Sequence, residues 1–592
     1  MFMSPSRSDR NFSDYGTAPI KLGNTRRRGT ALILVSSLIF MIFAGRLVDL
    51  QAIKGSELAS AALDQRLRTV FLPAKRGSIL DSNGAPLAIT VAAKNVTADQ
   101  TMIAEPGVVA QALSPILGAD ADILASRLTG ERRSIFLAKE VTPQTWEKIS
   151  ALRLPGIFSE DTSRRIYPSG ELAANVIGFV GAEGTGLGGY EFAFDERLRG
   201  TPGKATFERG PGGRAIPTGA SVRVDAQAGV DVELTIDRDI QYVAQKAISE
   251  AVESAGAKDG SVVVMDPQSG QILALATAPT FDPNFATQTA ERDRNNRPLT
   301  SIFEPGSTSK VMTLAAVINE EAATPYTPIK VPEVLRRGDT DFKDSTPNGT
   351  LRLTLNGVLA KSSNVGTILA AERIGGKKLS KYLKKFGIGQ PTGLKFPGES
   401  HGSVPEHEDW SPTSFPTISF GQGLSVNSVQ VASVYSTIAN DGLRVEPSLV
   451  KRFIHADGTS EQPTAPQTTR VVSRDTAIQM RVMLESVVGE GGTATNAKIP
   501  GYRVGGKTGT AQVIDARLGG YSDEVVASFV GMAPADNPRL VVGVFISEPQ
   551  NGRYGGELAA PVFKKVSSYA LGALQIPPTG SKAPKLALTF GG

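Results

Sequence analysis

The stretch Phe303-Glu304-Pro305-Gly306-Ser307-Thr308-Ser309-Lys310, followed by VMTLAAVINE (311–320), decides how the rest of this 592-residue chain is interpreted. A Pro-Gly break before a helix-forming run predicts that Ser307 lies in the first turn of a helix. Free backbone N–H groups and the helix dipole favour negative charge there. Positions i and i+3 share one helix face, so the Lys310 amine can reach the Ser307 hydroxyl. A lysine with the usual pKa near ~10.4 becomes a base at neutral pH only when it is desolvated or lies beside another cation.

An SxxK pattern alone is weak evidence, because a capping serine followed by a solvated lysine is the commoner reason for it. Two further motifs change that interpretation. Lys361-Ser362-Ser363-Asn364 precedes the helical run VGTILAAERI, which places a hydroxyl and an amide two residues apart at a helix start. Lys507-Thr508-Gly509-Thr510 lies in the strand-like VGGKTGTAQV, where glycine permits close approach by an extended ligand. In this order, SxxK, SxN and KTG are highly specific.

The order and spacing of these three motifs resemble those of the penicillin-binding transpeptidases and serine β-lactamases. Residues 229–573 are similar to a transpeptidase domain. The resemblance implies an α/β fold with a five-stranded antiparallel sheet, helices on both of its faces and an all-helical lobe that carries SxN.

The same resemblance implies a role for each motif residue. It makes Ser307 the acylated nucleophile, Lys310 its base and Ser362 the proton relay. It assigns the substrate amide to Asn364, a supporting positive charge to Lys507, and the substrate carboxylate to the strand residues Thr508, Gly509 and Thr510. The oxyanion hole would be formed by the backbone N–H groups of Ser307 and Thr510. This scheme uses no cofactor and no metal.

Three motifs in the N-terminal half resemble those of class B penicillin-binding proteins. They are Arg76-Gly77-x-Ile79-x-Asp81-x-Asn83-Gly84-x-x-Leu87-Ala88, Arg165-Ile166-Tyr167-Pro168-x-Gly170 and Gly186-x-x-Gly189-x-Glu191, with Ser82 where the first motif usually has arginine. The resemblance implies a non-catalytic pedestal, and no lysozyme-like glycosyltransferase module is recognised. Within class B, the division-specific transpeptidases of the FtsI type (penicillin-binding protein 3) are the best match, and the elongation-specific enzymes are the alternative.

Other proteins carry the same three catalytic motifs. A membrane-tethered β-lactamase would need a group that activates water, usually a glutamate, and none can be placed from the sequence. A penicillin-sensing receptor would need a cytoplasmic signalling module, which 28 residues cannot hold.

A membrane anchor is predicted near the N-terminus, because Gly29–Gly45 is a 17-residue stretch without a charge. As a helix it would be ~25 Å long, which Arg46 can extend by snorkelling. Arg26–Arg28 precede it, so the positive-inside rule predicts a cytoplasmic N-terminus and an extracytoplasmic catalytic domain on the cell membrane. A cleaved signal peptide is disfavoured because no small-x-small site follows.

Five segments are predicted along the chain. They are a cytoplasmic tail (1–28), a transmembrane helix (29–46), a pedestal (47–224), a transpeptidase domain (225–573) and a C-terminal tail (574–592). Amphipathic patterns also predict helices over 51–70 and near 106–127, and the region 199–224 is rich in turn residues.

Three other patterns resemble known functional sites but lack the structural context that those sites need. Gly184–Gly189 matches a dinucleotide fingerprint, but no βαβ unit follows, so a close-packed glycine turn is expected. Gly398–Gly402 matches GxSxG around Ser400 without the strand-turn-helix that a nucleophile elbow needs. His401, His407 and their acidic neighbours lack the spacing of a metal site.

Composition excludes several classes of function. Cysteine is absent, so disulfides, thiolate catalysis and Cys-ligated metals are excluded. The net charge is only +5, and six basic residues against two acidic ones in 1–28 supply most of it. There is therefore no charge argument for nucleic-acid binding. The resemblance instead implies peptidoglycan stem peptides as substrates, β-lactams as covalent inhibitors, and an FtsW-type glycosyltransferase with other divisome membrane proteins as partners.

Overall fold

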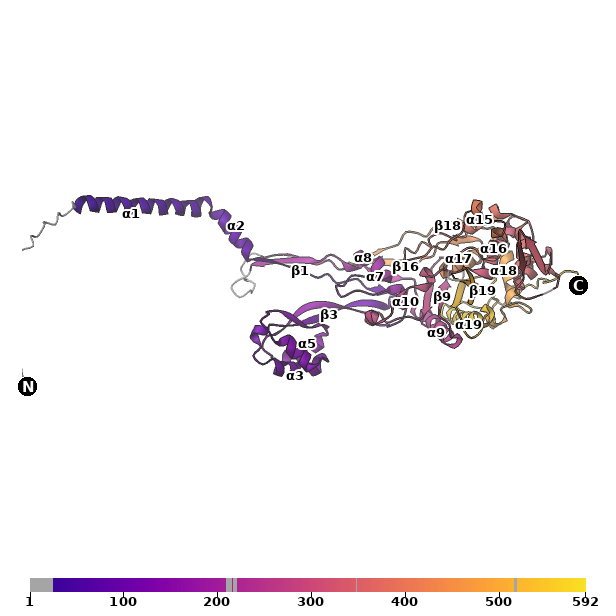
Figure 1. Ribbon diagram of the computed structural model, residues 1–592, viewed down its shortest axis with the longest axis horizontal. Coiled ribbons are helices and arrows are strands. Elements are labelled where there is room, and N and C mark those ends of the chain that lie inside the picture. The colour runs from indigo at the N-terminus through magenta and orange to yellow at the C-terminus, as the bar shows by residue number, and fades with distance from the viewer. Residues whose placement is uncertain (1–24, 209–215, 217–220, 348, 516–518, 592) are drawn as a thin grey trace, which may run out of the picture. The chain divides into compact units, whose positions relative to one another are not determined.

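The computed structural model describes residues 25–208, 216, 221–347, 349–515 and 519–591 and divides into two compact units. The first comprises the chain up to Leu72 together with Gly203–Asp225, and the second comprises Pro73–Pro202 and Ala226–Gly592 (Figure 1). The tail predicted over 1–28 lies outside the described residues as far as position 24.

The first unit contains the apolar helix α1 (Thr25–Val48), which continues through a π-helical turn (Asp49–Ile53). An 18-residue window within Thr25–Ile53 has a mean hydropathy of 2.3, and none of that window is buried. A 24-residue helix is about 36 Å long, enough to cross a hydrocarbon core. It is the one helix among the described residues that is long and apolar enough to do so, which is consistent with a single membrane anchor.

The helix predicted over 51–70 ends earlier than expected. Helix α2 spans Gly55–Arg66, and the following LRTVFL forms strand β1 (Leu67–Leu72), since β-branched and aromatic residues favour a strand. Strand β1 pairs with β6 (Gly203–Glu208), which pairs with β7 (Ser221–Val224). The turn-rich region at 199–224 therefore contains two strands.

The second unit holds a seven-stranded sheet that joins distant parts of the chain. Its order is β17 (Ser460–Glu461), β16 (Val450–Ile454), β8 (Asp231–Leu234), β2 (Ile79–Leu80), β3 (Pro86–Ala98) and β4 (Ile135–Val141), with β5 (Ile157–Ile166) also paired to β3. Strands β2 and β8 are parallel, so the region after residue 225 and the region before it share one sheet.

A small satellite lobe with its own core lies beside β3 and β4. It contains α3 (Pro106–Leu117), α4 (Ala121–Leu128) and α5 (Pro143–Ala151), which bury Leu113, Leu128 and Ile149. The single helix predicted near 106–127 is thus two helices. Gly118 adopts a left-handed conformation (φ +64°) that ends α3, as C-terminal glycines commonly do.

The three class B motifs meet at one buried carboxylate, that of Glu191 in the short helix α7 (Gly189–Ala193), which has no exposed surface. Arg76 and Arg165 each place a guanidinium nitrogen 2.7 Å from it, and the Tyr167 hydroxyl donates to it at 3.4 Å. Burial raises the pKa of Tyr167, and the Glu191 charge adds to that shift. Gly184–Gly189, which match a dinucleotide fingerprint, pack closely against this network. A Cβ on Gly186 would lie 2.0 Å from the Glu191 carbonyl oxygen, so only glycine fits there.

The five-stranded antiparallel sheet has the order β10 (Ile272–Ala278), β9 (Asp259–Met265), β21 (Leu540–Ser547), β20 (Gly520–Ala533) and β19 (Gly505–Asp515). Helices cover both faces, as expected. Phe529 of β20 packs on Phe563 of α19 (Gly555–Ala573), beside α9 (Arg238–Ala255). Ser261 points to the opposite face and contacts Ser428 at the start of α17 (Ser428–Ala439).

A mainly helical lobe adjoins this sheet. It contains α12 (Lys310–Asn319), α13 (Leu355–Ala360), α14 (Asn364–Ala371), α15 (Gly376–Lys385), α16 (Ser414–Phe420) and α18 (Arg474–Val488). Two short ribbons accompany the helices: β11 (Pro328–Val331) with β14 (Leu351–Thr354), and β12 (Val334–Arg337) with β13 (Thr340–Lys343). Residues 586–590, near the end of the chain, return to β14 and α13, where the Thr354 amide donates to the Leu588 carbonyl.

We expect Glu191→Gln to lower the free energy of unfolding by about 3–5 kcal/mol, because it leaves two buried guanidinium groups without their shared anion. Urea unfolding of the full chain in detergent, followed by circular dichroism, measures the loss. The control is Asp161→Asn, which breaks an exposed pair with Lys94 and should cost under about 1 kcal/mol. Equal losses in the two variants would show that the Glu191 network does not hold the pedestal together.

Candidate active site

Ser307 lies in a 3-10 turn (Gly306–Ser309) that leads directly into α12. Gly306 has φ +51°, and its amide donates to the Gly421 carbonyl at 2.9 Å. The Thr308 hydroxyl donates to the Pro305 carbonyl, and the Tyr435 hydroxyl donates to the Thr308 carbonyl at 3.0 Å. The turn is therefore fixed on several sides, while Ser307 keeps partial exposure. This is the placement that the sequence predicts.

Lys310 is the first residue of α12 and has no exposed surface. Its Nζ donates to the Ser362 carbonyl at 2.6 Å and to Asn364 Oδ1 at 2.7 Å, and it lies 3.2 Å from Ser362 Oγ. No hydrogen bond joins Lys310 to Ser307 among the described residues. The structure therefore brings the first two motifs together through the lysine, and the serine stays available to a ligand.

The SxN motif occupies the sharp connection between α13 and α14, and Asn364 begins α14 as expected. Ser362 adopts φ +60°, a conformation that side-chain-bearing residues rarely take and that often marks functional sites. Ser363 caps α14 by accepting from the Gly366 amide. The strained backbone directs both the carbonyl and the hydroxyl of Ser362 toward Lys310.

The KTG motif lies on β19, the edge strand beside the Ser307 turn. Lys507 is also fully buried, and its Nζ donates to Ser362 Oγ at 2.8 Å and to the Thr508 carbonyl at 2.9 Å. A Cβ on Gly509 would lie 3.0 Å from the Thr308 side chain and 2.4 Å from Ser528 Oγ, so only glycine allows this strand to approach. Thr510 next to it is half-buried.

Both lysines have lowered pKa values. Burial lowers the pKa of Lys310 to about 7, against an opposing effect of the Asp344 carboxylate. Burial, and then the charge of Lys310, lower the pKa of Lys507 well below its usual value. A proton on one amine therefore disfavours protonation of the other, so one of the two amines is neutral near neutral pH. Because the Ser362 hydroxyl contacts both amines and can accept from one while donating to the other, it can carry a proton between them.

Three residues that the sequence analysis did not identify complete the site. Asp344 accepts from Ser363 Oγ at 2.8 Å and from the Val365 amide at 3.0 Å, which holds the start of α14. Thr493 shares a 2.8 Å hydrogen bond with Thr508. Tyr521 of β20 donates to Glu304 at 2.9 Å, which ties that strand to the segment before Ser307. None lies in a recognisable motif.

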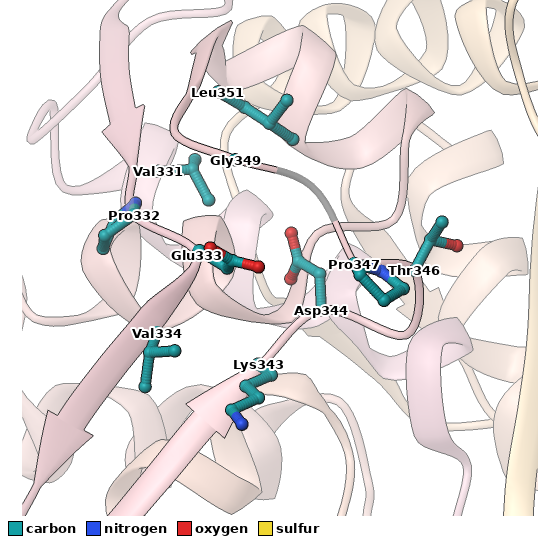
Figure 2. A pocket seen from close by; sticks show the side chains of 10 residues that line it. All are labelled: Val331, Pro332, Glu333, Val334, Lys343, Asp344, Thr346, Pro347, Gly349 and Leu351. Atoms are coloured by element: carbon teal, nitrogen blue, oxygen red, sulfur yellow. The ribbon is translucent and has the colours of Figure 1, made fainter.

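A cavity of about 190 Å³ opens beside the SxN motif and is lined by parts of β11, β12, β13 and β14. Figure 2 shows the carboxylates of Glu333 and Asp344 directed into it, while the Lys343 side chain points away. The Lys343 carbonyl accepts from Asn364 Nδ2 at 3.4 Å. Two lining residues, Lys343 and Asp344, thus also hold the start of α14.

Two other patterns from the sequence, GxSxG around Ser400 and the histidines near it, lie in the described part of the chain. Residues 398–402 form a loop in which the Ser400 amide donates to the Leu299 carbonyl, so there is no nucleophile elbow. The region of His401 and His407 contains no group of three or more potential ligands arranged for a metal, and none was found elsewhere in the described part of the chain.

Comparison with known proteins agrees with this geometry. Residues 260–568 match the penicillin-binding protein transpeptidase domain, and residues 71–234 match the penicillin-binding protein dimerisation domain. The chain is 36% identical to penicillin-binding protein PbpB of Mycolicibacterium smegmatis over 600 residues, covering 95% of this chain and 92% of that protein. It is 34% identical to peptidoglycan D,D-transpeptidase FtsI of Escherichia coli, covering 93% and 92%.

Among solved structures, penicillin-binding protein 3 of Mycobacterium tuberculosis in complex with aztreonam is similar, with a TM-score of 0.71 and 33% identity. That likeness covers 88% of this chain and all of the solved chain.

We expect the lowered pKa of Lys310 to appear as a pH dependence of stability. From pH about 7 up to the ordinary lysine pKa near ~10.4, the unfolded lysine binds a proton that folded Lys310 does not. The free energy of unfolding therefore rises with pH in this window. Lys310→Met removes that contribution, so the stability difference, wild type minus variant, should grow from pH 6 to pH 9. Urea midpoints of the full chain in detergent measure it.

The control for this experiment is Lys564→Met, at an exposed position on α19. It should leave the pH dependence of the wild type in place. A pH-independent difference between the wild type and Lys310→Met would mean that Lys310 stays protonated in the fold.

Proposed function

The chain belongs to the class B penicillin-binding proteins, which are peptidoglycan D,D-transpeptidases, and from that premise we propose that it crosslinks stem peptides through an acyl-enzyme on Ser307 during septal wall synthesis. The observation that supports the mechanism is the meeting of Lys310 and Lys507 at the Ser362 hydroxyl.

In the proposed first step, Ser307 Oγ attacks the carbonyl between the two terminal D-alanines of a stem peptide. The serine proton passes to the neutral Lys310 amine, and the negative charge on the carbonyl oxygen is held by the backbone N–H groups of Ser307 and Thr510. The peptide bond then breaks. The departing D-alanine amine takes a proton from the lysine pair by way of Ser362, and the peptide remains as an ester of Ser307.

In the second step, an amine of another stem peptide attacks this ester, loses its proton to the same lysine pair and restores the Ser307 hydroxyl. Thr508, Gly509 and Thr510 would bind the donor's terminal carboxylate, with Lys507 adding positive charge. Asn364 uses Oδ1 to hold Lys310 and one N–H of Nδ2 to reach the Lys343 carbonyl, so the second N–H of Nδ2 would face the substrate amide.

A β-lactamase is the alternative within the wider superfamily, and it would need a carboxylate that activates water. Glu304, three residues before Ser307, already accepts from the Gly423 amide and the Tyr521 hydroxyl, and burial raises its pKa. Asp344 is likewise occupied by Ser363 and Val365. Both carboxylates thus already accept hydrogen bonds from the protein, which supports the transpeptidase over the β-lactamase.

The proposed location is the cell membrane, with a single span, the N-terminus in the cytoplasm and the catalytic domain outside. Arg26–Arg28 lie in the first turn of α1 and support this orientation. The proposed partners are an FtsW-type glycan polymerase and other divisome membrane proteins. Small residues on α1 (Gly29, Ala31, Ser36 and Ser37) would allow close packing against a partner helix. An elongation role is the alternative.

We expect a labelled penicillin to acylate Ser307 and Lys310→Arg to slow this acylation at least ~10²-fold, since arginine keeps the charge but cannot act as a base. Lys507→Arg should be milder, because positive charge is most of its role. In the wild type, the acylation rate should rise with pH through the Lys310 pKa of about 7. Intact-protein mass spectrometry with peptide mapping measures rate and position.

Ser400→Ala is the control and should acylate normally. Label on a residue other than Ser307 would contradict the assignment of the nucleophile, and equal losses in the two lysine variants would contradict their different roles. Rapid loss of label would support the β-lactamase alternative.

We expect depletion of the protein to block septation while growth continues, which gives filamentous or branched cells. Replacing residues 29–45 with an unrelated membrane helix should preserve penicillin binding but abolish division, because α1 would lose its partner contacts. Microscopy of depleted and complemented cells measures both outcomes. Loss of cell shape with continued division would assign the protein to elongation, and full function with the foreign helix would reduce α1 to a plain anchor.

A further inference from the structure

A second pocket, of about 540 Å³, lies away from the catalytic motifs, between α15 and the strand pair β15 (Leu443–Val445) and β18 (Thr468–Arg470). Figure 1 shows α15 and β18 at the same edge of the second unit. Five cationic side chains line it: Lys377, Lys381, Lys384, Lys385 and Arg444. Its volume lies in the range of small-ligand sites. None of its lining residues takes part in the proposed reaction.

Arg444 is the unusual group in this pocket. It is only 8% exposed, yet among the described residues its guanidinium donates no hydrogen bond, and its one ion pair is a loose contact of 3.7 Å with Glu446. Burial lowers its pKa, and Glu446 alone opposes that effect. Buried charges in proteins are normally paired and hydrogen-bonded, because leaving them unsatisfied is costly. Arg444 therefore presents N–H donors to the pocket that an anionic ligand can accept.

The fold makes specific room for this side chain. Gly387 follows α15 with φ +87°, and a Cβ there would lie 2.4 Å from Arg444 Nη1. Any larger residue would displace the guanidinium. The absence of a side chain at Gly387 thus leaves the space that the Arg444 guanidinium occupies.

The four lysines around Arg444 differ in whether they already have a partner in the protein. Lys384 pairs with Glu406, and Lys385 lies over the Tyr382 ring. In contrast, Lys377 and Lys381 have no ion pair within the part of the chain that the structure describes, although the charge of Lys381 acts on Glu320. The two lysines stand one helical turn apart, where like charges repel. Two cations at the rim and one at the base fit a ligand with more than one negative group.

The pocket also carries acidic side chains, which narrows the class of ligand. Glu408 lines it without an ion pair among the described residues, alongside Glu406 and Glu446. A phosphodiester polymer has only negative charges and would leave these carboxylates without a partner. An uncrosslinked stem peptide carries several carboxylates together with a free amine, so it matches both signs.

We propose that this pocket is a second, non-catalytic binding site for an uncrosslinked stem peptide, with one peptide carboxylate held by the Arg444 fork, further negative charge at Lys377 and Lys381, and the peptide amine toward Glu408. This inference rests on the proposed function for the identity of the peptide. A carboxylate fits the planar guanidinium through two parallel hydrogen bonds.

The protein contains its own reporter for this site. Its two tryptophans are Trp146, in the satellite lobe, and Trp410, whose ring lies 5.2 Å from the His407 ring that lines the pocket. In a Trp146→Phe background, the fluorescence of the full chain in detergent therefore reports on Trp410. Acylating Ser307 with penicillin beforehand occupies the catalytic site, so a further response to peptide comes from elsewhere.

We expect a synthetic stem pentapeptide ending in D-Ala-D-Ala to change Trp410 fluorescence saturably in the acylated chain. Arg444→Gln should weaken binding at least tenfold, Arg444→Lys should weaken it less, and Lys381→Gln should weaken it a few-fold. The matched control is Lys378→Gln on the same helix, since Lys378 pairs with Glu320 and does not line the pocket. It should bind as the wild type does. Unchanged penicillin acylation in each variant shows that the fold is intact.

Two further probes test the chemistry. The pentapeptide with its carboxylates amidated should not bind, and tripolyphosphate should compete only weakly. Equal binding of the amidated peptide, stronger binding of tripolyphosphate, or wild-type affinity in Arg444→Gln would each overturn the inference. If penicillin fails to acylate Ser307 while the Trp410 response persists, the proposed function fails and the pocket stands. Normal acylation without a Trp410 response would support the proposed function and overturn the inference about the pocket.

Discussion

Two lysine side chains buried against a single serine hydroxyl are the constraint on which this structure depends. Lys310 and Lys507 have no exposed surface, and both lie within hydrogen-bonding distance of Ser362 Oγ. A buried ammonium is costly, and a second one nearby raises that cost, so the pair loses a proton near neutral pH. Burial of the two amines therefore lowers the free energy of unfolding, and it makes a base of a lysine that would ordinarily be protonated at neutral pH.

The surrounding elements serve to bring the two lysines to one point. Lys310 starts a helix, Lys507 lies on an edge strand, and Ser362 lies between two helices. Each placement needs a backbone that most sequences avoid: φ +51° at Gly306, φ +60° at Ser362, and at Gly509 a strand position with no room for a Cβ. The strained backbone of Ser362 persists because the packed helices on either side fix its surroundings.

The sequence predicts what depends on short spacing. SxxK, SxN, KTG, a helix start close to Ser307, the helix start at Asn364 and the apolar N-terminal helix all come from residues that are neighbours in the sequence. It does not predict contacts between distant residues, such as Tyr521 with Glu304, or Arg444 beside Gly387. It also missed β1, where amphipathic spacing continued past the end of α2, and the division of 106–127 at Gly118. Local propensity decided both cases.

Residues far from the catalytic motifs, near the end of the chain, also stabilise the site. The sequence favours a tail after residue 573, yet the Thr354 hydroxyl donates to the Ala587 carbonyl and the Phe590 amide to the Arg352 carbonyl. Leu586, Leu588 and Phe590 alternate with small or polar residues, a strand pattern too short to identify alone. Thr354 caps α13, and α13 ends directly before the SxN motif. Since the strained Ser362 needs rigid neighbours, contacts made by the last residues of the chain help to hold the hydroxyl that both lysines share.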